Sequence, residues 1–480
     1  MNKTQFHFIA IGGIGMSGCA KYLLKKGYKV SGSDIEDNKY LKPLAEMGAK
    51  IFIGHDEKNI EDNENLIIVV STAIHQDNPE LLKAKELGLK IFHRSDLLSY
   101  IASEFQKKEH KNDKLPIFFG FSGTHGKTTT SGLCSYILNK AKQNSSFIVG
   151  GIVPEINTNA LYNGDDYFVA ELDESDGTIV KYSPNISVIN NLELDHIDFY
   201  KDGLASLFET FDTYILGLKE NSVVILNKDN KNTMELLKRH NDKNLKFVTF
   251  SLNDKTADYY ADEINYIDLG SKFNVYKNGQ YLGIIEMNIP GEHNVYNALA
   301  VISALMKAEF NFNDISNYFS SFTGMGRRFQ KAAEFNNIIV IDDYGHHPTE
   351  ICFTLKSVSL SKRRKIAIFQ PHRYTRLQGL WNEFIECFKN NNIDLLVVTD
   401  VYAASEDEIE NINSQKFVED FKNHSNIESI YVSGSIKEAS KNILPNLKPN
   451  DLVLTFGAGD ITKMGSYLEE NYTNLAKKIR

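Results

Sequence analysis

The chain has 480 residues, and its 53 Lys and Arg against 62 Asp and Glu give a formal net charge of −9. Hydrophobic residues make up 42% and charged residues 24%, which excludes collagen-like, disulfide-scaffold and wholly disordered proteins. The mild acidity argues against a main role in binding nucleic acid or anionic lipid, because either needs a basic surface. At roughly 150 residues per domain, this length predicts about three domains.

The cysteines and the apolar runs indicate a protein of a reducing compartment. Cys19, Cys134, Cys352 and Cys387 form no CxxC pair and no cluster, so we expect neither a disulfide framework nor a zinc site. No apolar run approaches the roughly 18–20 residues of a membrane span. Met1–Cys19 superficially resembles an export signal with a lipid-modified cysteine, but repeated glycines interrupt its apolar stretch. We therefore expect a strand, a glycine turn and a helix there, in a cytoplasmic protein.

The first segment alternates apolar strands with helical stretches. We expect a helix over Gly18–Lys26, and strands over Phe6–Ile11, Lys29–Ser33, Leu66–Ser71 and Lys90–Phe92. This rhythm predicts a parallel, Rossmann-like sheet. The charged stretch Ser103–Pro116 interrupts it, which predicts a first domain over residues 1–110.

Two further α/β segments follow. The second, residues 111–325, has a predicted helix from about Lys127 and a hairpin signal at Lys277–Gln280, which indicates a small antiparallel excursion in a mostly parallel sheet. Its predicted strands are Ile117–Phe121, Tyr167–Leu172, Ser187–Asn190, Val223–Leu226 and Phe247–Phe250. The third, residues 326–480, predicts a second Rossmann-like unit with strands Ile338–Ile341, Lys365–Phe369, Leu395–Thr399, Ser429–Val432 and Leu452–Phe456.

A first glycine-rich loop follows the first strand. Gly13–Gly18 fits the pattern G-x-G-x-x-G before a helix, and Asp34 lies at the end of the next predicted strand, directly after Ser33. Such a loop brings backbone N–H groups and a helix N-terminus to a diphosphate, and Asp34 suits a ribose hydroxyl. Local features alone favour NAD or FAD, but the same loop fits a nucleotide-sugar or a purely structural turn.

A second glycine-rich loop, Gly123–Thr130, is the strongest motif in the chain. It lies at a predicted strand–helix junction and carries Gly-Lys-Thr, a combination that holds nucleotide phosphates. Lys127 suits the β- and γ-phosphates and Thr128 suits Mg²⁺. The loop is a variant of G-T-x-G-K-T type, because Phe121 occupies the position of the first P-loop glycine.

Acidic runs follow two of the apolar strands in the second segment. Glu171 ends one strand, and the run Asn190–Asp198 follows the next. The carboxyl ends of parallel strands gather on the side of a phosphate loop, where acidic groups can hold cations against a polyphosphate. The alternative is that these are charged loops facing solvent.

Together these motifs resemble the Mur ligase family over essentially the whole chain. The resemblance rests on eight motifs in order: GGIGMSG at Gly12–Gly18, GTHGKTTT at Gly123–Thr130, ELDESD at Glu171–Asp176, LELDHID at Leu192–Asp198, GEHNVYNALA at Gly291–Ala300, GRRFQ at Gly326–Gln330, DDYGHHPTE at Asp342–Glu350 and QPHRYTR at Gln370–Arg376. It implies an ATP-dependent, amide-forming ligase. The expected substrates are UDP-N-acetylmuramate, L-alanine and ATP, and the expected intermediate is an acyl phosphate.

The resemblance also implies roles for individual residues. ATP contacts are expected from Gly123, Thr124, His125, Gly126, Lys127, Thr128, Thr129, Asn294, Asn297, Arg327 and Asp343, and metal ligation from Thr128, Glu171 and His196. Lys127, Glu171, His196, His346, Arg373 and Arg376 are the expected catalytic groups. The expected UDP-sugar site is Gly12, Gly13, Ile14, Gly15, Met16, Ser17, Asp34, His55, Ser71 and Thr72. Asn294 and Asn297 could instead only cap a helix, and Arg327 with Arg328 could form a hinge salt bridge.

Three alternative functions remain at this point. A related recycling ligase joins a preformed tripeptide to the same UDP-sugar, but Ser175 in ELDESD favours L-alanine, because the tripeptide ligases tend to carry an aromatic residue there. An NAD-dependent oxidoreductase fits Gly13–Gly18 with Asp34 but leaves Gly123–Thr130 unexplained. A non-catalytic nucleotide switch would bind ATP without ligation.

Overall fold

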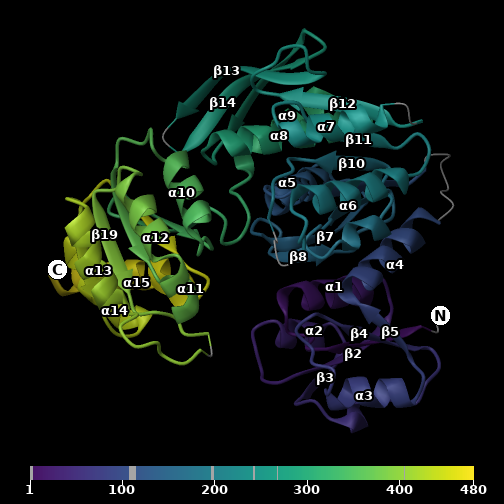
Figure 1. The fold of residues 1–480 in the computed structure, drawn as a ribbon, viewed down its shortest axis with the longest axis horizontal. Coiled ribbons are helices and arrows are strands. Elements are labelled where there is room, and N and C mark those ends of the chain that lie inside the picture. Colours follow the sequence, from purple (N-terminus) through teal and green to yellow (C-terminus); the bar gives the residue numbers. More distant parts are fainter. Residues whose placement is uncertain are drawn as a thin grey trace. The chain divides into compact units, whose positions relative to one another are not determined.

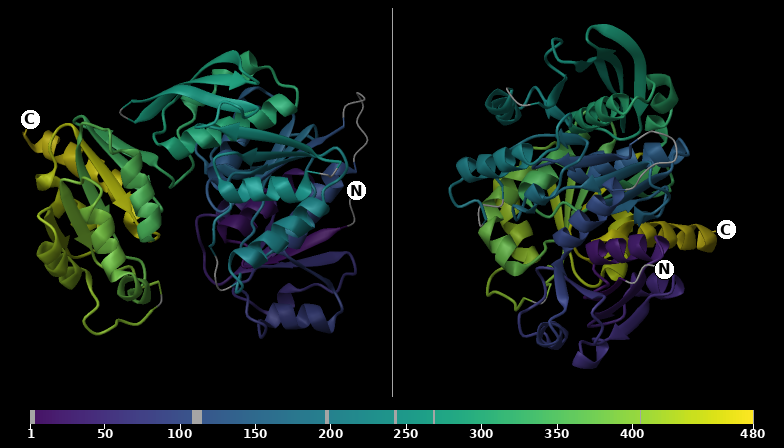
Figure 2. Two further views of the ribbon diagram at one scale, coloured as in Figure 1. Left: turned by 45° about the horizontal axis from the view of Figure 1, so that its top comes forward. Right: turned by 90° about the vertical axis from the view of Figure 1, so that its right-hand side faces the viewer.

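The computed structural model describes residues 4–107, 115–195, 199–241, 244–267, 269–404 and 406–479. The chain forms two compact units, the first made of Met1–Glu263, Phe273–Ile285 and His293–Phe322, and the second of Ile264–Lys272, Glu286–Glu292 and Thr323–Arg480. Three sheets follow one another along the sequence, coloured purple to blue, blue to teal, and green to yellow in Figures 1 and 2. The predicted α/β class with three sheet units is confirmed, whereas the boundaries at 110 and 325 stay predictions.

The N-terminal sheet is parallel, with strand order β3-β2-β1-β4-β5. This is the Rossmann-like order, in which the chain reverses direction across the sheet beside β1. Its strands are β1 (Gln5–Ile9), β2 (Lys29–Asp34), β3 (Lys50–Ile53), β4 (Leu66–Val70) and β5 (Lys90–His93), and its helices are α1 (Ile14–Lys25), α2 (Leu41–Glu46), α3 (Pro79–Glu86) and α4 (Arg94–Gln106). The helix predicted from Gly18 begins at Ile14, because Gly13 already acts as its N-cap.

The central sheet has ten strands in the order β15-β14-β13-β12-β11-β10-β6-β9-β7-β8. The parallel strands are β6 (Ile117–Ser122), β9 (Tyr167–Glu171), β10 (Ile186–Ile189), β11 (Val223–Asn227) and β12 (Lys246–Ser251), as predicted, together with β7 (Ser145–Val153). The associated helices are α5 (Lys127–Lys140), α6 (Leu204–Leu216), α7 (Lys231–His240), α8 (Glu292–Lys307) and α9 (Phe312–Ser316). The order places β6 between β10 and β9, so the loops after these three strands share one edge.

The predicted antiparallel excursion is present at one end of this sheet. It consists of β13 (Tyr259–Ile267), β14 (Gly270–Lys277) and β15 (Gln280–Met287). Asn278 and Gly279 both have positive φ, 49° and 81°, as a tight two-residue hairpin turn requires. Strands β3 and β7 were not predicted, nor was the antiparallel edge strand β8 (Thr158–Leu161), which pairs with β7.

The C-terminal sheet has the order β16-β17-β21-β18-β19-β20. Its parallel strands are β17 (Ile338–Asp343), β18 (Arg364–Phe369), β19 (Leu395–Thr399), β20 (Glu428–Val432) and β21 (Asp451–Phe456). The antiparallel β16 (Gln330–Phe335) was not predicted. The helices are α10 (Pro348–Ser357), α11 (Tyr374–Gly379), α12 (Trp381–Lys389), α13 (Ser414–His424), α14 (Ile436–Ile443) and α15 (Met464–Ile479).

The N-terminal and central sheets share one hydrophobic core. Helix α1 packs against β7 and β8, where the Tyr22 ring meets those of Tyr162 and Phe168 at centroid distances of 5.6 and 5.8 Å. The Asn159 Nδ2 donates to the Ile14 carbonyl oxygen at 2.8 Å. The first glycine loop is therefore braced by the central sheet as well as by its own domain.

Two of the four cysteines are paired in the structure, although their spacing in the sequence indicates no disulfide. Cys352 on α10 and Cys387 on α12 form a disulfide, with their Cα atoms 5.6 Å apart. The sequence could not show this pairing, because helix packing joins residues 35 positions apart. Cys19 and Cys134 are buried free thiols. No helix of the described residues is long and apolar enough to cross a membrane.

Candidate functional site

The second glycine loop connects β6 to α5, as predicted. Gly123 and Gly126 have φ values of 117° and 84°, which favour glycine strongly over other residues. A side chain on Gly123 would also place its Cβ 2.7 Å from the carbonyl oxygen of Asn191. The loop is anchored laterally, because the His125 N–H donates to Asn191 Oδ1 at 2.8 Å and Thr124 Oγ1 donates to the Glu193 carbonyl oxygen at 3.0 Å. These contacts fix the loop against the end of β10.

Lys127 opens α5 with its ammonium folded back over the loop. Its Nζ donates to Gly123 O at 2.9 Å, Thr124 O at 3.3 Å and Glu174 Oε1 at 2.9 Å. Burial lowers the pKa of Lys127, but the carboxylates of Glu174 and Asp173 outweigh it, so the net pKa is raised. A fixed, charged ammonium at the start of a helix is the feature that binds polyphosphate in such loops.

Thr128 and Glu171 form the second part of this site. Thr128 Oγ1 donates to Glu171 Oε1 at 2.9 Å, and the Gly150 N–H donates to the other carboxylate oxygen at 2.7 Å. Strand β9 delivers Glu171 beside the loop after β6, as the sequence predicts. No cluster of three metal-binding residues occurs within the described ranges. The predicted ligand His196 lies outside them.

The two asparagines of α8 lie behind the loop. Both side chains are buried, and Asn297 Nδ2 donates to Asn294 Oδ1 at 3.2 Å. Asn297 Oδ1 accepts from Thr130 Oγ1 at 3.1 Å, and a Cβ on Gly126 would lie 2.6 Å from the same oxygen. In this structure Asn297 therefore braces the start of α5, and its adenine contact stays a prediction.

The first glycine loop lies at the carboxyl edge of the N-terminal sheet. Asp34 Oδ2 accepts from the Gly12 N–H at 2.8 Å, which ties the end of β2 to the loop. Arg94, the first residue of α4, lies against the loop: a Cβ on Gly15 would come within 2.8 Å of Arg94 Nη1. Its exposed guanidinium thus stands beside the N-terminus of α1, where two positive features favour an anion.

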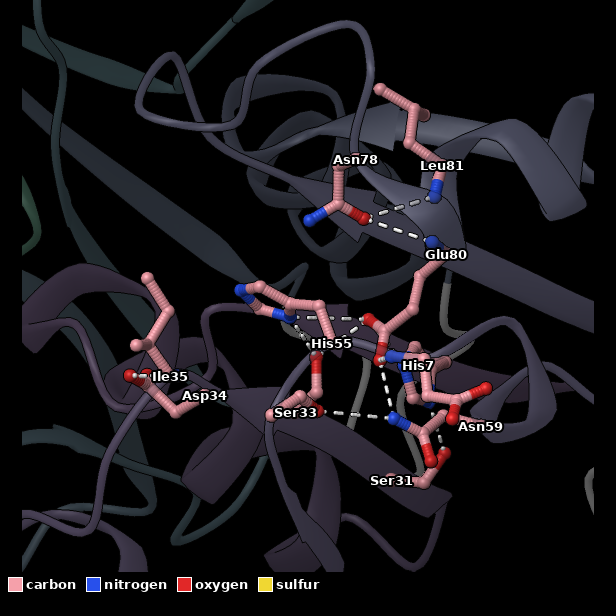
Figure 3. A network of polar contacts seen from close by, with 12 residues as sticks. His7, Ser31, Ser33, Asp34, Ile35, His55, Asn59, Asn78, Glu80 and Leu81 are labelled. Carbon is pink, nitrogen blue, oxygen red and sulfur yellow. Dashed lines mark hydrogen bonds and ion pairs between the residues drawn. The ribbon is translucent and has the colours of Figure 1, made fainter.

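His55 follows β3 at the same edge and is joined to a buried network. Its Nδ1 lies 2.9 Å from Ser33 Oγ and 3.6 Å from Glu80 Oε2 (Figure 3). Ser71 and Thr72 follow β4, half-buried and exposed respectively. The glycine loop, His55 and Ser71 thus follow strands of one parallel sheet, and Asp34 is the last residue of β2. This is the arrangement predicted for a nucleotide site.

In the second unit, Asp343 and Arg327 organise the loops after β17 and β21. Asp343 is buried and accepts from the N–H groups of Phe329 at 2.9 Å and Gly345 at 2.8 Å, and burial raises its pKa. The Arg327 guanidinium donates to the Gly457 carbonyl oxygen at 2.6 Å and lies over the Tyr344 ring. Both side chains hold loop geometry here, and their predicted ATP contacts are untested.

A cationic and imidazole cluster follows β17 and β18. The rings of His346 and His372 lie 5.7 Å apart, and Arg376 Nη1 lies 3.3 Å from His372 Nδ1. Because arginine only donates, that nitrogen accepts, and the His372 ring is neutral. Burial, His346 and Arg376 lower the pKa of His372 to about 4. Arg373 has a φ of 71° and an exposed side chain.

Comparison with family models covers almost the whole chain. The model of the Mur ligase family catalytic domain matches residues 5–106, that of the Mur ligase middle domain residues 121–305, and that of the Mur ligase glutamate ligase domain residues 327–459. The chain belongs to the Mur ligase family. The predicted family is therefore confirmed, and the three matches follow the three sheets.

Full-length relatives of this Mur ligase agree with that assignment. It is 38% identical to the UDP-N-acetylmuramate–L-alanine ligase of Geotalea daltonii over 467 residues, 97% of each chain, and 37% identical to that of Geobacter sulfurreducens over 96% of each. The solved UDP-N-acetylmuramate–alanine ligase of Thermotoga maritima superposes with a TM-score of 0.79 at 29% identity, covering 98% and 99% of the two chains. A murein peptide ligase of Psychrobacter arcticus shares the fold, with a TM-score of 0.67 at 21% identity and the same coverage.

Several residues at these edges were missed by the sequence analysis. Glu174 lies inside a recognised motif without an assigned role, and so does His372, whose neutral state depends on its neighbours. Arg94 was missed although it directly follows β5, a position that could have indicated it. Glu80 belongs to no motif that we singled out, and only the tertiary structure brings it to His55.

Proposed function

We propose that this Mur ligase joins L-alanine to the carboxylate of UDP-N-acetylmuramate at the expense of ATP, in peptidoglycan precursor synthesis. The observation that carries the proposal is the Lys127–Thr128–Glu171 arrangement at the carboxyl edge of β6 and β9. It provides a polyphosphate loop, a fixed cation and a carboxylate within one site. The similarity over 96–97% of the curated alanine ligases supports L-alanine as the amine.

In the proposed reaction, a carboxylate oxygen of the muramyl group attacks the γ-phosphorus of ATP, and the bond to the β-phosphate oxygen breaks. The amine of L-alanine then attacks the acyl carbon, and collapse of the tetrahedral intermediate releases phosphate and a proton. Negative charge accumulates on the transferred phosphoryl group. Lys127 stabilises this negative charge, because its ammonium is held rigidly and its raised pKa keeps it protonated.

Mg²⁺ fits the oxygen donors that the loop presents. Thr128 Oγ1 and Glu171 Oε1 lie 2.9 Å apart, and hydroxyl and carboxylate oxygens are ligands that this hard cation prefers. Mg²⁺ commonly takes one or two protein ligands together with substrate phosphates. Thr128 and Glu171 are therefore enough to provide the protein ligands. The bound ion would neutralise phosphate charge, and His196 stays a predicted further ligand.

The UDP moiety is proposed to bind at the first glycine loop. The α1 N-terminus and Arg94 suit its diphosphate, and Asp34 and His55 offer polar groups at the same edge. His346, Arg373 and Arg376 stay proposed catalytic groups of the third domain, and the cytoplasm stays the proposed compartment. Ligation of a preformed tripeptide is the alternative amine specificity.

A substrate panel tests the proposal directly. The protein is incubated with ATP, Mg²⁺ and UDP-N-acetylmuramate, and with L-alanine, glycine, L-serine or the tripeptide as the amine. We expect ADP release that requires both the UDP-sugar and L-alanine. A clear preference for the tripeptide would assign the recycling reaction instead, and ADP release that ignores the UDP-sugar would reject both.

A further inference from the structure

Glu80 is a fully buried carboxylate in the N-terminal domain with an unusual number of hydrogen-bond donors around it. It is the second residue of α3, and its Oε1 accepts from Asn59 Nδ2 at 2.6 Å and from the Asp56 N–H at 3.4 Å. Its Oε2 accepts from Ser33 Oγ at 2.5 Å and lies 3.4 Å from His7 Nε2 (Figure 3). Burial raises the pKa of Glu80, but hydrogen bonds from His7, Asn59 and Ser33 outweigh it, so Glu80 is ionised.

The protons in this network can be assigned by counting donors. An ionised carboxylate only accepts, so Ser33 gives its single hydroxyl proton to Glu80. Ser33 Oγ lies 2.9 Å from His55 Nδ1 and has only lone pairs left for that contact. His55 Nδ1 must therefore carry the proton and donate to Ser33. In the neutral ring, Nε2 is then unprotonated and accepts a hydrogen bond.

This imidazole stands at the proposed UDP site. His55 follows β3, and the N–H of the preceding residue, Gly54, donates to the Asp34 carbonyl oxygen at 2.7 Å. The Asp34 carboxylate in turn holds the Gly12 N–H of the glycine loop. The His55 side chain is 14% exposed, and Figure 3 shows its second ring nitrogen directed away from Ser33 and Glu80.

We propose that Glu80 is a positioning residue for uridine recognition, which holds His55 through Ser33 so that His55 Nε2 accepts a hydrogen bond from the uridine moiety. This inference rests on the proposed function, since it takes UDP as part of the substrate. Uridine offers donors in its uracil N3–H and its ribose hydroxyls. Cytosine has a lone pair at N3, so an acceptor at His55 would select against it if the donor is N3–H.

The proton positions can be read directly in the free protein. Ring nitrogen shifts of ¹⁵N-histidine distinguish the two neutral tautomers, with His55→Gln identifying the signals. We expect His55 to be protonated at Nδ1 in the wild type and to lose this preference in Ser33→Ala. A wild-type ring protonated at Nε2 would overturn the proposal, whatever the enzyme's activity.

Binding of UDP, measured by calorimetry, gives the second test. We expect Ser33→Ala and Glu80→Gln to weaken UDP binding roughly three- to tenfold, which corresponds to the loss of about one hydrogen bond. Ser33→Thr should bind UDP as the wild type does, because the hydroxyl remains. Ser31→Ala is the matched control, since the Ser31 hydroxyl lies 2.9 Å from Nδ1 of His7, whereas Nε2 of the same ring faces Glu80. Binding of ADP should not change in any variant, which separates this effect from loss of fold.

Comparison ligands identify the donor. If it is the uracil N3–H, Ser33→Ala reduces the preference for UDP over CDP, whereas a ribose donor reduces the preference for UDP over 2′-deoxy-UDP. Equal UDP affinity of wild type and Ser33→Ala rejects the role of Glu80 while leaving the ligase proposal intact. Absence of UDP binding by the folded wild type rejects both.

Discussion

Lys127 Nζ and Glu174 Oε1 lie 2.9 Å apart, in an ion pair whose carboxylate is only 2% exposed. The second oxygen, Glu174 Oε2, is buried without a hydrogen-bond partner among the described residues. The Lys127 ammonium is thus held by a buried carboxylate that has one oxygen without a hydrogen bond. The ammonium already donates to three acceptors, so a nucleotide phosphate that approaches Lys127 must replace one of them. We expect it to replace Glu174, so that Glu174 and the nucleotide compete for the same cation.

This competition predicts how Glu174→Gln affects stability. Removing the charge leaves the buried Lys127 ammonium with neutral acceptors only, and we expect a loss of about 1–3 kcal/mol in the free energy of unfolding without nucleotide. Saturating ADP with Mg²⁺ should shrink this loss, because phosphates then neutralise the ammonium. Urea unfolding with and without ADP measures both values.

The exposed Glu220 provides the control for that experiment. Its Oε1 accepts from Asn244 Nδ2 at 3.1 Å, and it lies far along the chain from the loop, so Glu220→Gln should change stability by less than about 0.5 kcal/mol. An equal cost of Glu174→Gln with and without ADP would show that the carboxylate and the phosphates do not compete.

Lys127→Ala separates the two glycine loops. We expect the ligation rate to fall at least about a hundredfold, because the substitution removes the fixed positive charge that stabilises the transferred phosphoryl group. UDP binding should remain largely intact, since Lys127 belongs to the loop after β6 and the proposed UDP site follows β1. Steady-state rates and calorimetry measure the two effects. Lys140→Ala, at the exposed end of the same helix, should leave both unchanged, and a parallel loss of UDP binding in Lys127→Ala would contradict the site map.

The contrast between predicted and unpredicted residues has a physical cause. Gly123, Lys127 and Glu171 could be placed from the sequence, because each adjoins an apolar strand and the carboxyl ends of parallel strands share an edge. Glu80 could not, because its role depends on four hydrogen-bonding groups from three other segments of the chain. The Cys352–Cys387 pair was missed for a similar reason, since it arises from the packing of α10 on α12.

Arg94→Ala tests the anion site beside the first glycine loop. A guanidinium at the start of α4 should contact the diphosphate, and its removal is expected to weaken UDP binding by about tenfold, the low end for a charged hydrogen bond. Uridine serves as an internal control because it has no phosphate, so its affinity should not change. Lys90→Ala, at the other end of β5, is the matched charge removal. Loss of UDP and uridine binding in the same proportion would indicate a fold defect rather than a lost phosphate contact.

The last prediction concerns the titration of His372. Its pKa is lowered from the ordinary 6.5 to about 4 by burial and by neighbouring cations that include Arg376. Protonation is therefore favoured in the unfolded chain, and the stability from the neutral ring is present above about pH 6.5 and is lost as the pH falls toward 4. Arg376→Ala should raise the pKa of His372 and reduce this loss of stability, which histidine NMR titration and unfolding at pH 5 and 7 would measure.

Arg363→Ala is the control for this experiment, because Arg363 precedes β18 whereas Arg376 follows it. It should leave the pKa of His372 unchanged. A His372 ring that titrates near 6.5 in the wild type would contradict the neutral, accepting state seen beside Arg376.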